Sequence, residues 1–514
     1  MARRPSPLLP SVLLLSLACA FFAAPAAPTP PPPATPAAPA ATITERPPTA
    51  QPAAATATPG ESSTAVPTVT IAAPPASPAP TRLNPAPPYV LFQNRHAIWL
   101  TNPDGSFPTQ LYAASAEAET AIESDLRASL SPAGDQLALV VASPAGLDLV
   151  LVAVPSGEAR TLAHLSDFTS DAELQNPASP AAFAKYAVRD YPSLAWQPGT
   201  GRLLAFIGVI DGPTADLYLY DTATAAIAQM TDGPSQAVLP SWSPDGQYLL
   251  QAGVSWVEPL GGALGPANHL DGVWAVRLSD GALLDQPRPA GVVPHNLGWT
   301  DAAHYLIYDS DDECFARDLR SVEVTTGAET PILPGSFYFS AARSPENGAL
   351  LFSGAAGCAD SVGEGTFLLL PGQTTPTQLD TQRAYEVAWL PESRVFQAYP
   401  EALYSADGQT RFDPPVYDAS FYGAVSAAGD QAWLVIQDRK GRLEVRTPGG
   451  DWQTVLPTDI SRHLWGPGGS RLLLMVTADG ELYSAAYPDF SPVDLGSLGG
   501  PIDAAVWVPA PPAQ

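Results

Sequence analysis

Two cysteines carry the most specific spacing in this sequence. Cys314 and Cys358 lie one repeat period apart, at matching positions in the long loops of two successive repeat copies described below. Equivalent loops of neighbouring repeats can approach closely, and an exported protein meets an oxidising environment. We therefore predict a disulfide between Cys314 and Cys358, the alternative being two free thiols.

An acidic run stands directly before the first of these cysteines. Its carboxylates are Asp309, Asp311, Asp312 and Glu313. Oxygen ligands at this density could hold Ca²⁺, but the run lacks the Asp-x-Asp-x-Asp-Gly spacing of a calcium loop. A solvated acidic loop is therefore the favoured interpretation, and a calcium site is the alternative. No other cofactor is expected, because the six histidines show no metal-ligand spacing.

Further polar and aromatic residues fall in the long segments between repeat strands. The candidates for contact with a ligand are His164, Asp167, Tyr186, Tyr191, Trp256, Glu258, His269 and Asp271. Aromatic rings could offer flat surfaces to a sugar or a peptide, although packing under loops is their commoner use. No catalytic residue is assigned, since no Gly-x-Ser-x-Gly nucleophile elbow occurs in the chain.

The elements that position these residues come from a repeated strand–turn–strand unit, clearest at Pro240 to Leu250. Its markers are Leu130-Ser131-Pro132, Trp196-Gln197-Pro198, Trp242-Ser243-Pro244, Trp299-Thr300-Asp301, Arg343-Ser344-Pro345, Trp389-Leu390-Pro391, Val425-Ser426-Ala427, Trp465-Gly466-Pro467 and Trp507-Val508-Pro509. Most intervals approach the length of a four-stranded propeller blade. The tryptophan kept in six of the nine copies is expected to anchor packing between blades.

The repeats predict an all-β fold, a single β-propeller of eight or nine four-stranded blades. The chain enters at Tyr89 as a second strand that lacks a first and leaves at Trp507 as a first strand that lacks the rest. Pairing of these N- and C-terminal strands would close the ring. The segments 160–192, 253–272, 309–317 and 354–365 should then emerge together on one side, the long-loop face, where binding is expected.

Within the first of these segments, Ser179-Pro180 predicts the start of a helix, with serine as the N-cap and proline in the first position. The helix should run to about Arg189. It would cap one edge of the long-loop face or shape a pocket there.

The motif Trp242-Ser243-Pro244-Asp245-Gly246 resembles the WD-like repeat of the periplasmic TolB family. Related repeats occur in the propellers of prolyl-oligopeptidase-type enzymes. The resemblance covers about 89–509 and implies a propeller. Neither the α/β domain of TolB nor a peptidase domain is recognisable in the sequence, so the activities of these families are not expected.

The N-terminal region predicts export. Residues 1–24 have the basic start and apolar run of a signal peptide, and Leu15 to Cys19 resembles a bacterial lipobox in which Cys19 would be acylated. Residues 25–88 hold 20 prolines and predict a disordered Pro/Ala/Thr-rich stalk before the propeller at 89–509 and a tail at 510–514. The protein should lie at the outer face of the cytoplasmic membrane or the cell surface, lipid-anchored or else secreted.

The net charge of the chain limits the classes of partner that it is expected to bind. The chain carries 51 acidic against 24 basic residues, a formal net charge of −27. This surface repels phosphate backbones, so nucleic acid is not expected, and the membrane would be reached through a lipid anchor only. The sequence favours a non-catalytic binding or scaffold protein of the cell envelope with a protein, peptide or glycan ligand. The alternatives are a glycosidase- or lyase-type propeller enzyme with carboxylates near the central channel, and a structural spacer in envelope assembly.

Overall fold

The computed structural model describes most of the chain between residues 83 and 508, all within the unit Ala76–Gln514. The described residues are 83–84, 87–94, 96–114, 121–122, 126–167, 177, 179–257, 267–289, 298–311, 315–344, 348–354, 360–370, 373, 375–384, 386–389, 395–399, 402–405, 407–412, 425–428, 433–437, 443–446, 452–456, 460–466, 472–486, 490–496 and 500–508. The predicted signal peptide, Cys19, nearly all of the stalk and the 510–514 tail lie outside them. No helix among the described residues is both long and apolar enough to cross a membrane.

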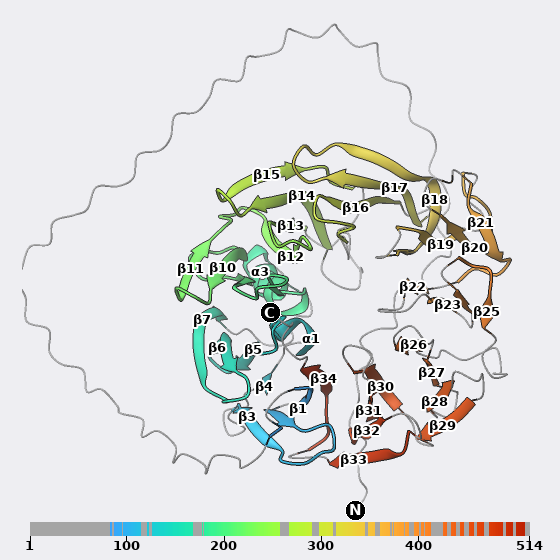
Figure 1. Ribbon diagram of the computed structural model, residues 1–514. Helices are drawn as coiled ribbons and strands as arrows, with labels where there is room; N and C mark the ends of the chain where they lie inside the picture. The colour runs from blue at the N-terminus through green and yellow to red at the C-terminus, as the bar shows by residue number, and fades with distance from the viewer. Residues whose placement is uncertain are drawn as a thin grey trace, which may run out of the picture. The chain divides into compact units, whose positions relative to one another are not determined.

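The first half of the described chain forms four-stranded antiparallel sheets, in the order of the repeats (Figure 1). The first sheet holds β1 (Tyr89–Asn94), β2 (Ala97–Thr101), β3 (Thr109–Ala113) and the last strand, β34 (Ala504–Val508). The second holds β4 (Ala121–Ile122), β5 (Gln136–Ser143), β6 (Gly146–Ala153) and β7 (Ala159–Asp167). The third holds β8 (Leu194–Trp196), β9 (Leu203–Gly208), β10 (Asp216–Asp221) and β11 (Ala226–Gln229). The fourth holds β12 (Gln236–Trp242), β13 (Tyr248–Val257), β14 (Ala267–Arg277) and β15 (Ala282–Gln286).

The second half departs once from the four-stranded pattern. A six-stranded sheet holds β16 (His304–Asp311), β17 (Phe315–Glu323), β18 (Glu329–Arg343), β19 (Leu350–Gly354), β20 (Gly365–Leu369) and β21 (Thr377–Asp380). Three four-stranded sheets follow: β22 (Glu386–Trp389), β23 (Val395–Tyr399), β24 (Ala402–Ser405) and β25 (Arg411–Phe412); β26 (Val425–Ala428), β27 (Trp433–Gln437), β28 (Leu443–Arg446) and β29 (Trp452–Leu456); β30 (Ile460–Trp465), β31 (Leu472–Thr477), β32 (Leu482–Ala486) and β33 (Pro492–Gly496). Two described helices, α1 (Leu126–Ser129) and α3 (Pro180–Asp190), lie between strands of the first half.

The six-stranded sheet arises because β18 serves two repeats. Its first part pairs with β17 as far as Phe337, and from Phe337 onwards it pairs with β19. Gly335 allows the long strand to change direction, since its φ is +79° and a Cβ there would stand 2.3 Å from the carbonyl oxygen of Asp360. Two repeats that the sequence predicts as separate four-stranded sheets are therefore joined. Overall, the sheet topology is that of a propeller-like, all-β fold.

The turn after Trp242 shows why the repeat motif folds as it does. The Ser243 hydroxyl donates to the Asp245 carboxylate at 2.6 Å and accepts from the amide of Tyr248 at 2.9 Å. Gly246 supplies a positive φ of +68°, and its amide donates to the carbonyl of Ser243 at 2.8 Å. The Ser-Pro-Asp-Gly sequence thus contains the donors and the backbone freedom that a tight hairpin needs.

The repeated tryptophan joins successive repeats through a hydrogen bond of its indole. In five of the six copies, the indole N–H donates to the carbonyl oxygen of the residue just before the preceding marker, at 2.8–3.4 Å. The pairs are Trp196 with Ser129, Trp242 with Ala195, Trp299 with Ser241, Trp389 with Ala342, and Trp507 with Leu464. The predicted role of this tryptophan as an anchor between repeats is confirmed.

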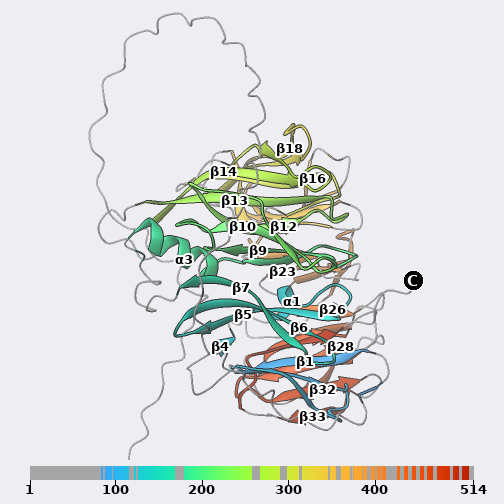
Figure 2. The ribbon, with the colours of Figure 1, turned by 90° about the vertical axis from the view of Figure 1, so that its left-hand side faces the viewer.

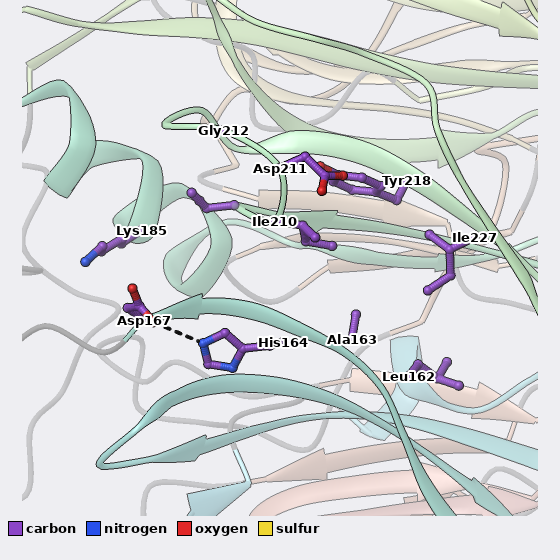
Figure 3. Close-up of a pocket in the computed structure, with 11 residues that line it drawn as sticks. Leu162, Ala163, His164, Asp167, Lys185, Ile210, Asp211, Gly212, Tyr218 and Ile227 are labelled. Atoms are coloured by element: carbon purple, nitrogen blue, oxygen red, sulfur yellow. Dashed lines mark hydrogen bonds and ion pairs between the residues drawn. The ribbon is translucent and has the colours of Figure 1, made fainter. Parts of the chain in front are cut away.

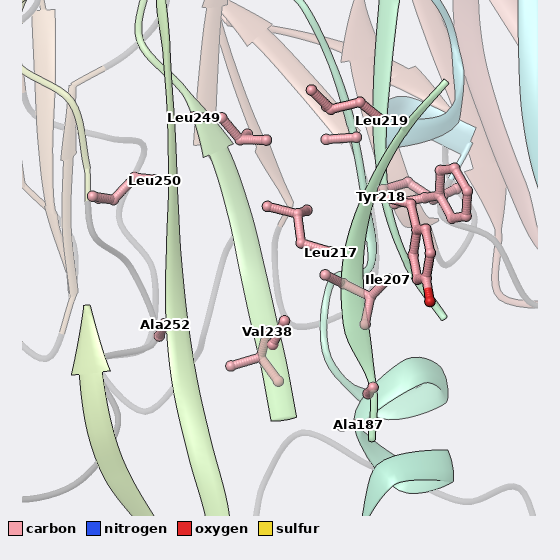
Figure 4. Close-up of a cluster of buried hydrophobic side chains, with 14 of the residues drawn as sticks. Ala187, Ile207, Leu217, Tyr218, Leu219, Val238, Leu249, Leu250 and Ala252 are labelled. Carbon is pink, nitrogen blue, oxygen red and sulfur yellow. The ribbon is translucent and has the colours of Figure 1, made fainter. Parts of the chain in front are cut away.

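The core lies between successive sheets. Leu217, Val238 and Leu249, from β10, β12 and β13, are fully buried in one cluster that runs from the second sheet to the six-stranded one. Figure 4 shows part of this cluster, with Ala187 of α3 against the same layer. Burial of both faces explains why the inner strands are nearly continuous runs of leucine, valine and alanine.

The strands that end at the long-loop face carry the candidate residues. β7, β9 and β13 end there, and β8, β10 and β14 begin there, as alternating antiparallel strands require. Figure 2 shows α3 on the same side of the molecule as the end of the hairpin at which β13 finishes and β14 begins. The segments 253–272 and 309–317 differ from the prediction, because much of each is strand: Ser255 pairs with His269, and Ser310 with Ala316. Cross-strand pairing extends the hairpins where the sequence suggested irregular loops.

Candidate functional site

A cleft of about 690 Å³ opens between the second and third sheets (Figure 3). One wall is the end of β7, the second is α3, and the third is the β9–β10 connection with parts of β10 and β11. The lining residues are Leu162, Ala163, His164, Asp167, Lys185, Val209, Ile210, Asp211, Gly212, Tyr218 and Ile227. The backbone amide of Val209 donates to the carbonyl of Leu165 at 2.6 Å, so the two sheet walls are joined at this point.

His164 lies between two carboxylates at the end of β7. Its Nδ1 is 2.8 Å from Asp148 Oδ1 on the neighbouring strand β6, and its Nε2 is 3.3 Å from Asp167 Oδ1. The hydrogen bond with Asp148 is the main reason why the pKa of His164 is raised above its usual range, with Asp167 adding to it. His164 and Asp167 keep 49% and 85% of their side-chain exposure, so both are open to a ligand.

The helix that the sequence predicts at Ser179 forms the second wall. Ser179 caps it by accepting from the amide of Ala182 at 3.2 Å, and Pro180 stands in its first turn. Phe183 and Ala187 are buried on the face that packs against the sheets, whereas Lys185 on the opposite face is half-buried and lines the cleft. The helix therefore does shape a pocket.

Asp211 and Tyr218 line the cleft across from His164 (Figure 3). Asp211 belongs to the connection between β9 and β10, and Tyr218 is a residue of β10. Burial raises the pKa of the Tyr218 phenol. Leu162, Ile210 and Ile227 supply an apolar strip of the cleft lining. The cleft thus combines apolar lining with charges of both signs.

The sequence analysis misses three charged residues in or beside the cleft: Lys185 and Asp211, which line it, and Asp148, which bonds to His164. Two of the three leave a signal in the sequence. Lys185 is one of only two lysines in the chain, the other being Lys440. Asp148 is the one charged residue of the otherwise apolar strand β6. Asp211 gives no comparable signal, because it meets the cleft only through the packing of two sheets.

The predicted aromatic candidates pack instead of presenting open faces. Tyr186 and Tyr191 meet edge to face with ring centroids 5.9 Å apart, and burial raises the pKa of Tyr191 to about 12. The indole of Trp256 donates to the carbonyl of Pro177 at 2.9 Å. These three side chains hold the connector between β7 and β8 against the sheets.

His269 and Asp271 form a second polar cluster, on β14. The carboxylate of Asp271 accepts from Ser235 Oγ at 2.5 Å and from Ser255 Oγ at 3.0 Å, and its Oδ1 lies 3.3 Å from His269 Nδ1. In these bonds both hydroxyls donate to the carboxylate and not to the imidazole. The arrangement therefore lacks the serine-to-histidine bond that activates a nucleophile.

The remaining candidates are only partly described. Asp309 is held by Arg320 through two contacts of 2.9 Å, and Asp311 pairs with Phe315 in the backbone ladder. Glu258, Asp312, Glu313, Cys314 and Cys358 lie outside the described residues. Within the described ranges, no group of three or more His, Cys, Asp or Glu side chains could hold a metal ion.

Comparisons with known proteins give weak likenesses only. No protein-family model and no curated protein matches the chain. TolB from Acinetobacter baumannii is 13% identical at a TM-score of 0.29, over 63% of this chain and 62% of TolB. Dipeptidyl peptidase 4 from Porphyromonas gingivalis is 10% identical at 0.34, over 71% and 58%. A prolyl endopeptidase structure is 13% identical at 0.34, over 68% and 58%. This chain spans less than two thirds of each of these proteins, and its fold assignment rests on the sheet topology.

Proposed function

We propose that the protein is a non-catalytic binding protein that takes an extended, basic segment of a protein partner into the cleft beside β7 and α3. The cleft itself carries the proposal. Its volume of about 690 Å³ lies within the usual range of ligand sites, and it combines apolar lining with a few polar groups.

The charges favour a basic segment with apolar side chains. Asp211 and the exposed Asp167 can receive lysine or arginine groups, and Lys185 can bind a backbone carbonyl or a carboxylate of the same segment. The strip of Leu162 and Ile227 can bury the apolar side chains. A formal net charge of −27 on the whole chain would also steer a basic partner towards the protein.

The polar geometry supports binding over catalysis. Asp148 and Asp167 share one imidazole, and the raised pKa of His164 favours imidazolium, which is a poor general base. The hydroxyls near His269 bond to Asp271 instead. A carboxylate-based propeller enzyme and a purely structural spacer are the competing functions, and the experiment below separates them from a binder.

We further propose that the sheets form one ring of nine blades with a TolB-type repeat. The six-stranded sheet would contribute two blades, because β18 pairs with strands of two repeats. The antiparallel pairing of β1 with β34, from Tyr89 opposite Val508 onwards, supports closure by the two ends. Export, acylation of Cys19 and a stalk at 25–88 complete the proposal and place the binding face outside the cytoplasm.

The test exploits the scarcity of lysine. The purified protein is treated with an amine-reactive reagent, and labelling of Lys185 is compared with that of Lys440 in the same sample by mass spectrometry. The probes are a peptide of alternating leucine and lysine whose amines are dimethylated, and the same peptide with glutamate in place of lysine. The basic peptide should bind and slow labelling of Lys185 alone, and binding should weaken as salt is added.

Matched variants locate the contact. Asp211→Asn should weaken binding of the basic peptide by about tenfold, in line with loss of a charge-assisted hydrogen bond. Glu158→Gln removes the same charge next to β7 at its opposite end, where the side chain is exposed, and should leave binding unchanged. Equal binding of both peptides, or equal effects of the two variants, would overturn the proposal. Turnover of a glycoside or peptide substrate would favour the enzyme, and absence of all binding would favour the spacer.

A further inference from the structure

A second, smaller pocket lies between the β11–β12 connector and the fourth sheet and is separate from the cleft. It has a volume of about 240 Å³ and sits under the connector from β11 to β12. Its lining residues are Met230, Thr231, Asp232, Gly233, Pro234, Ser235, Ala237, Gln251, Gly253, Trp274 and Leu283. This volume is below the range of sites for drug-sized ligands, so the pocket fits a molecule of about one ring.

The floor of this pocket is the indole of Trp274. The ring lies over two glycines: a Cβ on Gly253 would stand 2.3 Å from Trp274 Cζ3, and one on Gly272 would stand 2.6 Å from Cζ2. Only residues without a side chain let the indole lie flat across β13 and β14 at this point. Trp274 is half-buried, so it lines the pocket and is not fully enclosed in the core.

Gln251 supplies a polar group that the fold leaves unused. It stands opposite Trp274 in the β13–β14 ladder, and its side chain is only 3% exposed. Its Oε1 has no hydrogen-bond partner among the described residues. A buried amide oxygen without a partner is unfavourable, so a ligand that donates a hydrogen bond to it would be favoured.

The other polar groups of the pocket are hydroxyls and a carboxylate. Ser235 donates its hydroxyl proton to Asp271, which leaves its oxygen able to accept. Asp232 stands exposed at the connector and offers a carboxylate. Among the described residues that line the pocket there is no lysine, arginine or histidine, so its chemistry suits a neutral ligand rich in hydroxyl groups.

We infer that this pocket binds a neutral pyranose ring, with one apolar face of the sugar on Trp274 and a sugar hydroxyl donating to Gln251. A stacked aromatic ring and amide or carboxylate acceptors at its rim together match the two surfaces of a sugar, apolar C–H faces and an equatorial belt of hydroxyls. The site is independent of the peptide cleft and adds a second ligand class to the long-loop face. The sugar is either a free monosaccharide or the terminal residue of a glycan.

The experiment follows Trp274 directly. The protein is labelled with 5-fluorotryptophan, and the fluorine NMR signal of Trp274 is assigned from its loss in Trp274→Phe. The probes are the methyl glycosides of glucose, galactose, mannose and N-acetylglucosamine at millimolar concentration, each paired with an oligosaccharide that ends in the same sugar. At least one glycoside should shift the Trp274 signal in a saturable manner. Tighter binding of its oligosaccharide indicates a glycan end, and equal binding indicates a free sugar.

Two variants test whether weaker sugar binding comes from loss of the acceptor or from misfolding. Gln251→Met should weaken the sugar about tenfold while the protein stays folded, because the substitution keeps side-chain length and removes the acceptor. Gln247→Met, an exposed position at the other end of the same hairpin, should leave binding unchanged. The inference fails if no glycoside moves the Trp274 signal, if Gln251→Met binds sugar as the parent does, or if indole binds where every sugar fails.

Discussion

Replacement of Trp242 by phenylalanine tests whether the repeated indole bond couples neighbouring sheets. The side chain is 7% exposed, and its N–H donates to the carbonyl oxygen of Ala195 at 2.9 Å across the boundary between the third and fourth sheets. Phenylalanine keeps an aromatic ring in the interface but cannot donate. The substitution therefore removes the hydrogen bond between the sheets and a smaller amount of buried apolar surface.

The magnitude follows from two losses. A carbonyl oxygen that loses a buried donor costs about 1–3 kcal/mol. Phenylalanine also buries roughly 40 Å² less apolar surface than tryptophan, which at about 25 cal/mol per Å² adds about 1 kcal/mol. Trp242→Phe should therefore lower the free energy of unfolding by about 2–4 kcal/mol.

The assay is urea-induced unfolding, followed by amide hydrogen exchange to locate the effect. Trp256→Phe is the matched control, because its half-buried indole also donates at 2.9 Å, but to Pro177 in the segment before α3 and not to a strand of another sheet. The control should lose about 1 kcal/mol or less, and its faster exchange should stay near α3. If the two variants lose equal stability, or if exchange in β8 and β12 is unchanged by Trp242→Phe, the coupling role of the tryptophan is refuted.

Three further predictions concern other contacts. In proton NMR, the pKa of His164 should lie above the usual histidine range, and it should return towards that range in Asp148→Asn. Because the pKa of His164 is raised in the folded state, its pairing with Asp148 stabilises the fold below the unfolded pKa of about 6.5. This contribution disappears as the pH rises through the folded pKa. Non-reducing peptide mapping should find Cys314 joined to Cys358, and two alkylatable thiols would contradict the disulfide. Asp216→Ala should lower the free energy of unfolding in urea by about 3 kcal/mol and speed amide exchange in the β11–β12 connector. The reason is that the Asp216 carboxylate, 2% exposed, accepts hydrogen bonds from one backbone amide and two threonine hydroxyls. Unchanged exchange in the connector would contradict that role.

The disulfide prediction gains support from the described residues beside the cysteines. The guanidinium of Arg317 lies 2.6 Å from the carboxylate of Asp360, so the segments that follow the two cysteines meet. Ser336 donates to the other oxygen of Asp360 at 2.7 Å and ties it to β18.

The features of the fold that were predicted correctly are those that a local motif or the repeat period encodes. The Ser-Pro-Asp-Gly turn after Trp242 and the helix cap at Ser179 depend on residues close together in the chain, and each was expected at its observed place. The tryptophan anchors bond to residues 43–67 positions away, but they could be predicted because they recur with the repeat. The merged strand β18 was missed, because its direction depends on the contact of Gly335 with the distant Asp360. Long-range packing of this kind leaves no period in the sequence.

The candidate site was predicted only in part for the same reason. His164 and Asp167 were expected on the long-loop face and do line the cleft, since they lie three residues apart at the end of one strand. Lys185 and Asp211 enter from a helix and from the next sheet, and only the packing of these elements brings them together. Trp256 was expected as a ligand contact, but its indole bonds to the carbonyl of Pro177, which lies 79 residues earlier in the chain and which the sequence could not place beside it.

The pairing of β1 with β34 also determines the order in which the protein can fold. β1 finds β2 at once, because only a short turn separates Asn94 from Ala97. Its other edge pairs with Ala504–Val508, more than 400 residues later in the chain, so that edge stays open until these residues have been synthesised. An open strand edge attracts other chains. The nascent protein is therefore most prone to aggregate before Ala504–Val508 arrive, and loss of this last strand should harm solubility more than loss of an internal hairpin of equal length.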